Sequence, residues 1–152
     1  MPDSTARTEA KVAYNITGKA PSPLGAYSHA VLAGGFLFVS GQGARDPDTG
    51  IEEGVTMDEN GKVIAYDIKV MTEAVIKNLK VVLEEDGLSL ENLVDVTVFL
   101  KDMKDFPQYN EVYKKHFSFD SPPARTTVQA ADLPGRNYIE IKAVAYKGGL
   151  SA

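Results

Sequence analysis

The chain has 152 residues, the length of one domain, which is enough to bury a hydrophobic core. Its 16 basic and 21 acidic residues give a net charge of −5, and no basic run exceeds Lys114-Lys115, so a nucleic-acid surface is disfavoured. The absence of cysteine excludes disulfides and thiolate chemistry, and no apolar run approaches the ~20 residues that span a bilayer. We therefore expect a cytoplasmic protein without a membrane segment.

The two histidines are far apart in the sequence. His29 and His116 lack the spacing of metal ligands, so we expect no metal site, and a structural role for His29.

The predicted elements begin after a polar tail. Residues 1–11 predict disorder, and 12–148 predict a single domain. A short strand is expected within 11–17. Two apolar runs separated by Gly34-Gly35 then predict a hairpin whose second strand is 36–40, because this dipeptide suits a tight turn with positive φ. Residues 45–66 are rich in Gly, Asp and Glu, and predict a long loop.

Two helices are predicted by apolar residues at steps of three and four, over 67–86 and 105–117, with Gly87 ending the first. Between them, 93–101 alternates as a central strand with Val94, Val96, Val98 and Leu100 on one face. Pro122-Pro123 stops the second helix and precedes a final β-hairpin.

The order β-β-β, helix, β, helix, β-β predicts an α+β fold in which two helices cover one face of a sheet of about six strands. The other face is expected to be too apolar for solvent, because residues 36–39 are apolar on both sides and Phe99 lies opposite the valines. A second subunit covering that face would explain this pattern, so we expect an oligomer.

Side-chain alternation in the final hairpin brings charges together. Ile139 and Ile141 are expected to face the helices, which turns Glu140 to the other side, and taking Val128 as a core residue places Arg125 and Thr127 there too. Pairing Thr127 with Glu140 makes Arg125 a diagonal neighbour at roughly 7–8 Å. Two interpretations remain open: an ordinary cross-strand ion pair, or an anion-binding arginine beside a catalytic carboxylate.

Four stretches together resemble the Rid family, also called the YjgF family, of reactive enamine/imine deaminases. They are PLGAYSHA, LFVSGQGARDPDTG, VFLKDMKDFPQYNEVY and PPARTTVQAADLPGRNYIEIKAVAY, and they cover most of residues 21–147 in order. The resemblance implies a chorismate-mutase-like fold, a homotrimer, and active sites at the subunit interfaces.

The resemblance also implies roles for individual residues. Arg125 would bind the substrate carboxylate and Glu140 would position the hydrolytic water. The remaining implied pocket residues are Tyr27, Ser40, Gly41, Asn110 and Thr127. Taken alone, Tyr27 could be an interface aromatic, Ser40-Gly41 a strand-ending turn and Asn110 a cap. Many relatives have cysteine where this chain has Thr127.

The chemistry implied needs no cofactor: a carboxylated enamine becomes an imine, water adds to it, and ammonia leaves. The substrate would be of the 2-aminoacrylate kind or a longer dicarboxylate. The second class is suggested because segment 51–68 is similar in length and placement to the insert of the 2-aminomuconate deaminase branch. Two other functions of family members stay open. One is a translation-inhibitor or ribonuclease role, against which the acidic composition argues, and the other is carboxylate binding without turnover.

Overall fold

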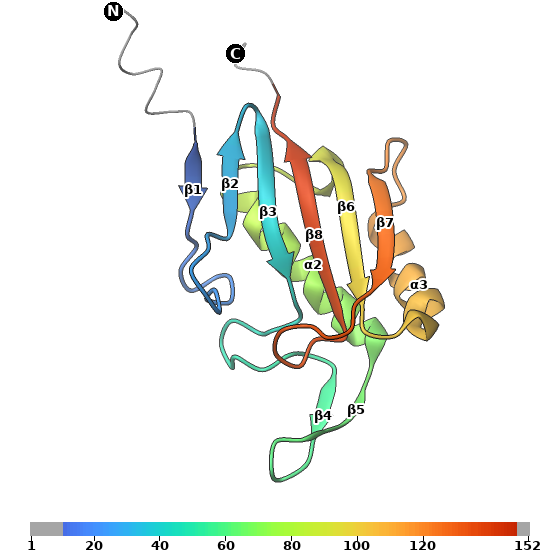
Figure 1. The fold of residues 1–152 in the computed structure, drawn as a ribbon. Coiled ribbons are helices and arrows are strands. Elements are labelled where there is room, and N and C mark those ends of the chain that lie inside the picture. Colours follow the sequence, from blue (N-terminus) through green and yellow to red (C-terminus); the bar gives the residue numbers. More distant parts are fainter. Residues whose placement is uncertain (1–10, 149–152) are drawn as a thin grey trace, which may run out of the picture.

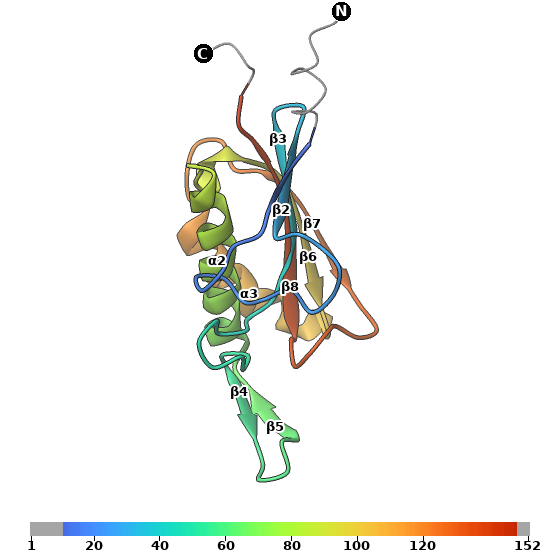
Figure 2. The same ribbon diagram turned by 90° about the vertical axis from the view of Figure 1, so that its left-hand side faces the viewer.

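The computed structural model describes residues 11–148, in which a six-stranded mixed sheet carries two helices on one face (Figures 1 and 2). The predicted disorder of residues 1–10 lies outside the described residues. The strands are β1 (Val12–Tyr14), β2 (Ala30–Ala33), β3 (Phe36–Gln42), β4 (Val55–Met57), β5 (Val63–Tyr66), β6 (Leu93–Leu100), β7 (Ala124–Gln129) and β8 (Ile139–Tyr146). The helices are α2 (Ile68–Glu85) and α3 (Phe106–His116), with 3₁₀ turns at Leu90–Asn92 and Met103–Asp105. The predicted fold class is confirmed, with the main sheet ordered β1-β2-β3-β8-β6-β7.

The predicted hairpin is β2–β3. Gly34 and Gly35 both have positive φ, 58° and 80°, which is the geometry that two-residue turns between antiparallel strands require. The second strand runs beyond the predicted Ser40 to Gln42, after a register irregularity between Val39 and Gln42.

The predicted long loop over 45–66 is wrong in part, because it contains the two-stranded ribbon β4–β5. Asp58 builds its turn by accepting hydrogen bonds from the backbone N–H groups of Asn60 and Lys62, both 2.9 Å. The ribbon extends past one end of the main sheet (Figure 2). Its strands have only three and four residues, too few to show a clear alternation in the sequence.

Helix α2 matches its prediction closely. Asp67 caps it by accepting hydrogen bonds from the N–H groups of Lys69 and Val70, and Gly87 follows the C-terminal end with φ 71°. All the apolar residues of its predicted stripe are buried against the sheet: Ile68, Met71, Val75, Leu79, Val82 and Leu83.

One residue of β6 faces the side opposite to the prediction. The register of β6 against β8 shifts between Leu93 and Asp95, so Leu93 is buried, whereas Val94 is 42% exposed. A β-bulge adds one residue to a strand and reverses the alternation beyond it, and period-two counting of the sequence misses this.

The predicted final hairpin is wrong, because β6 lies between β7 and β8. Strand β7 pairs with β6 in parallel, and β8 pairs with β6 antiparallel. Helix α3 connects β6 to β7 and returns the chain to the starting end of the sheet, which is the connection that parallel neighbours need. Strand β7 is therefore an edge strand.

The face of the sheet opposite the helices is open and largely apolar in the single chain. Large side chains exposed on it include Phe36, Phe38, Val128 and Tyr146, each between 38% and 46% accessible. An apolar surface of this kind is typical of a face that another protein covers. Of the helices in residues 11–148, none combines the length and apolar character that crossing a bilayer requires.

Candidate functional site

Glu140 lies in β8 and faces away from the helices. Its neighbours Ile139 and Ile141 are fully buried on the helix side, so strand alternation directs Glu140 to the open face. Burial raises the pKa of this half-buried carboxyl above its ordinary value of 4.5. Glu140 is thus a carboxylate with little compensating polar contact, which is the environment of a general base.

A hollow of about 70 Å³ adjoins Glu140 and is lined also by Tyr27 and Gly41. At Gly41 a Cβ atom would lie 2.7 Å from Oε2 of Glu140. Any larger residue at this position would force the carboxylate to move. The structure therefore brings three of the residues from the sequence prediction together, and gives Gly41 a steric reason to be glycine.

His29 holds the segment that carries Tyr27. Its Nδ1 accepts a hydrogen bond from the N–H of Ile16 (3.0 Å), and its Nε2 lies 2.8 Å from the carbonyl of Pro21. This pairing supports the expected structural role of His29. Ser40 fixes the same segment, because its hydroxyl donates to the carbonyl of Ser28 at 2.6 Å. Ser40 therefore supports the wall of the hollow and does not line it.

Arg125 lies in β7, an edge strand that is separated from β8 by β6, and it contacts α3. Its Nη1 donates a 2.8 Å hydrogen bond to Oδ1 of Asn110, and its guanidinium lies 4.6 Å from the centre of the Tyr113 ring. Two further rings are within 5.7 Å, those of Phe106 and Tyr109. These contacts fix the guanidinium without neutralising it, because no carboxylate of residues 11–148 forms an ion pair with Arg125.

Two tyrosines complete this second group. The hydroxyl of Tyr109 shares a short hydrogen bond with Thr127, and the buried hydroxyl of Tyr113 has no partner in the described part of the chain. Burial raises the pKa of Tyr113 to about 12, so this hydroxyl stays protonated at neutral pH. The hydrogen bond with Tyr109 connects the side chain of Thr127 to α3.

The predicted side-by-side placement of Arg125, Thr127 and Glu140 is wrong for a single chain. Arg125 is paired with Val96, which faces the helices, whereas Glu140 is paired with Phe99 on the open face. The error follows from taking Val128 as a core residue, although it is 39% exposed at the sheet edge. The residues of the predicted site form two separate groups: Tyr27, Gly41 and Glu140 on the open face, and Arg125, Asn110 and Thr127 at the β7 edge.

The comparisons with known proteins agree on one family. The family model described as Endoribonuclease L-PSP matches residues 17–147. The chain belongs to this family. A RutC family protein of Pyrococcus abyssi is 46% identical over 132 residues, which are 87% of this chain and 94% of the relative. The rat 2-iminobutanoate/2-iminopropanoate deaminase is 37% identical over 132 residues, 87% of this chain and 88% of that protein.

A solved member of the conserved Rid protein family, YyfA of Yersinia pestis, superposes with a TM-score of 0.76 at 34% identity, covering 90% of this chain and 99% of that one. The resemblance to the Rid family is thus confirmed, and the Endoribonuclease L-PSP and Rid names refer to the same kind of protein here.

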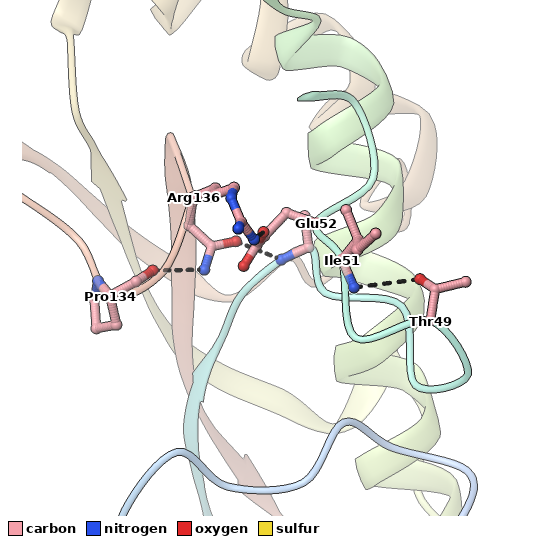
Figure 3. Close-up of polar contacts among 7 residues, drawn as sticks. Thr49, Ile51, Glu52, Pro134 and Arg136 are labelled. Atoms are coloured by element: carbon pink, nitrogen blue, oxygen red, sulfur yellow. Dashed lines mark hydrogen bonds and ion pairs between the residues drawn. The ribbon is translucent and has the colours of Figure 1, made fainter. Parts of the chain in front are cut away.

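This L-PSP family chain also places Arg45 at the hollow, which the sequence analysis did not predict. Asn137, just before β8, holds the neighbouring backbone: its Oδ1 accepts from the N–H of Ala44 (2.8 Å) and its Nδ2 donates to the carbonyl of Pro134 (2.9 Å). Figure 3 shows Pro134, and it shows Glu52 beside Arg136, with which Glu52 forms an ion pair. Taken alone, Ser40-Gly41 suggested a strand-ending turn, whereas β3 continues to Gln42. No periodic pattern in the sequence shows where the side chain of Arg45 points.

Proposed function

We propose that this L-PSP family protein is a cofactor-independent hydrolytic deaminase that converts carboxylated enamines or imines to keto acids and ammonia. The observation that carries the proposal is the half-buried Glu140 carboxyl, whose pKa is raised, beside a hollow. The same chain holds the Arg125 guanidinium in place with no anionic partner among residues 11–148. The name of the rat relative, an imine deaminase, supports the same reaction class.

The chemistry assigns one task to each group. Arg125 binds the substrate carboxylate through paired N–H donors and draws electron density away from the imine carbon. Glu140 removes a proton from water as the water oxygen bonds to that carbon, and the protonated Glu140 then gives this proton to the nitrogen, which forms the carbinolamine. Glu140 next moves the hydroxyl proton of the carbinolamine to the nitrogen. The C–N bond breaks, ammonia leaves, and the carbonyl of the keto acid remains. An enamine first takes a proton at its carbon to become the imine.

The two groups must meet across a subunit boundary. Within one chain Arg125 faces the helices and Glu140 faces the open side of the sheet, so a ligand that contacts both needs a second copy. The exposed apolar side chains of the open face supply a reason for copies to associate, since burying them removes apolar surface from water. A homotrimer with three interface sites is the assembly that we propose, as the family resemblance implies.

The substrate belongs to one of two classes, 2-aminoacrylate-like or 2-aminomuconate-like. The longer segment that suggested the second class forms the β4–β5 ribbon, and none of residues 46–66 lines the hollow within the chain. Within one chain, the ribbon therefore gives no support to the second class.

Ammonia release tests the proposal. Purified protein is incubated with 2-aminoacrylate generated in the assay and, in parallel, with 2-aminomuconate, and ammonia is measured against heat-denatured protein. We expect acceleration with at least one of them. No acceleration with either, together with saturable carboxylate binding, would indicate a binding protein, and cleavage of RNA by the same preparation would support the second activity that the family description names.

A further inference from the structure

Arg45 is a second arginine at the site, and it lines the same hollow as Glu140 and Tyr27. It is half-buried. One of its N–H groups donates to the carbonyl of Ser22, and none of residues 11–148 forms an ion pair with it. A guanidinium has five N–H donors, so a single carbonyl partner leaves most of them available to a ligand.

Glu52, a carboxylate whose backbone pairs with that of Arg45, has a different ion-pair partner. Glu52 faces Arg45 across an isolated antiparallel bridge, where an ion pair would be expected. Instead, the buried carboxylate of Glu52 lies 3.4 Å from Nη1 of Arg136 (Figure 3). The glycine at position 135 makes room for it, because a Cβ there would lie 2.7 Å from Oε1 of Glu52. Within residues 11–148, Arg45 is therefore left without an ion-pair partner.

The backbone that carries Arg45 is held from two sides. Nδ2 of Asn78, a buried residue of α2, donates 2.9 Å hydrogen bonds to the carbonyls of both Gly43 and Arg45. On the other side Asn137 accepts from the N–H of Ala44 at 2.8 Å, and Ala44 itself is fully buried. Because the backbone at Arg45 is already fixed, little backbone conformational entropy is lost when its side chain binds a ligand.

We propose that Arg45 binds a second acidic group of the ligand, so that the site accepts dicarboxylates in preference to monocarboxylates. The inference rests on the proposed function, in which Arg125 binds the first carboxylate. Glu140 repels any carboxylate placed against it, so the two acidic groups occupy the two arginines and the reacting carbon lies between them, next to Glu140.

A purely structural role for Arg45 would have different consequences. If its bond to Ser22 only fastens residues 21–24 over the hollow, then removing it would weaken all ligands alike. If it binds a second carboxylate, only ligands with two acidic groups would lose affinity. The ratio of the two affinities separates the roles.

The experiment measures binding by isothermal titration calorimetry with two unreactive keto acids, 2-oxoglutarate and 2-oxobutanoate. We expect the unaltered protein to bind 2-oxoglutarate more tightly, and Arg45→Gln to weaken 2-oxoglutarate by about tenfold, the loss of a charge-assisted contact, with 2-oxobutanoate changed by less than about twofold. Arg45→Lys should retain part of the preference. Lys62→Gln, which removes one charge at the exposed ribbon turn, is the matched control and should change neither.

Equal weakening of both ligands by Arg45→Gln, or no weakening of either, would overturn the proposal. Circular dichroism checks that the variant is folded, and if Arg45→Gln is not, the same ratio is read from Arg45→Lys. Binding can be measured without turnover. If the protein prefers dicarboxylates but releases no ammonia, the proposed deaminase activity is refuted, whereas the proposed binding of a second carboxylate by Arg45 is supported.

Discussion

Replacing Arg125 with alanine should lower kcat/KM for a carboxylated imine by about 10²-fold, mostly through weaker binding, because the paired N–H contacts to the carboxylate are lost. Arg125→Lys should recover only part of this loss, since an ammonium group keeps the charge without the planar pair of donors. Steady-state ammonia release at several substrate concentrations separates KM from kcat.

The control for this variant is Lys114→Ala. Lys114 is an exposed cation of α3, the helix whose side chains contact Arg125. It should leave kcat/KM unchanged. If a folded Arg125→Ala protein releases ammonia at the normal rate, Arg125 does not bind the substrate carboxylate.

Replacing Glu140 with glutamine should have the largest effect on the chemical step. We expect kcat to fall by about 10²–10⁴-fold, the usual contribution of a general base, while keto acid binding is retained because Arg125 and Arg45 are intact. Glu59→Gln, at the exposed ribbon turn, removes the same charge far from the hollow and should leave kcat unchanged. Normal turnover by Glu140→Gln together with normal binding would identify a different base.

The raised pKa of Glu140 gives this variant a second signature. The folded protein holds the proton on this carboxyl more tightly than the unfolded chain does, so its contribution to stability is full at acidic pH and is lost as pH rises through the folded-state pKa. Glu140→Gln should therefore melt at a higher temperature than the unaltered protein at neutral pH, and the difference should disappear below pH about 4. The acidic limb of the kcat profile of the unaltered protein should likewise lie above the ordinary pKa of 4.5.

Parts of the fold with a strong local cause could be predicted from the sequence. The turn at Gly34-Gly35 needs two positive φ angles, and α2 carries its apolar stripe between an Asp cap and Gly87. The parallel pairing of β7 could not be predicted in this way. An edge strand is buried on neither side as firmly as a central one, so Val128 gave a misleading signal about which way Arg125 points.

The site residues also divide into those that the sequence could predict and those that it could not. Glu140 could be predicted to leave the helix face, because fully apolar neighbours on both sides force its direction. Arg45 could not, since it lies beyond the end of β3, and its direction depends on two amides distant in the sequence, Asn78 and Asn137. In the proposed function the two separate groups of residues join only in an assembly, and side-chain alternation along one chain does not show which residues of two copies would meet.

The central claim is that each site takes Arg125 from one subunit and Glu140 from another, and a mixing experiment tests it most directly. Arg125→Ala and Glu140→Gln chains, each with strongly reduced activity alone, are co-expressed with different tags, and assemblies that carry both tags are assayed for ammonia release. In a closed ring of three that holds both kinds of chain, one of the three interfaces receives both intact residues, so we expect activity of about a third of that of the unaltered protein. Activity no higher than that of the two separate variants would contradict a site shared between subunits.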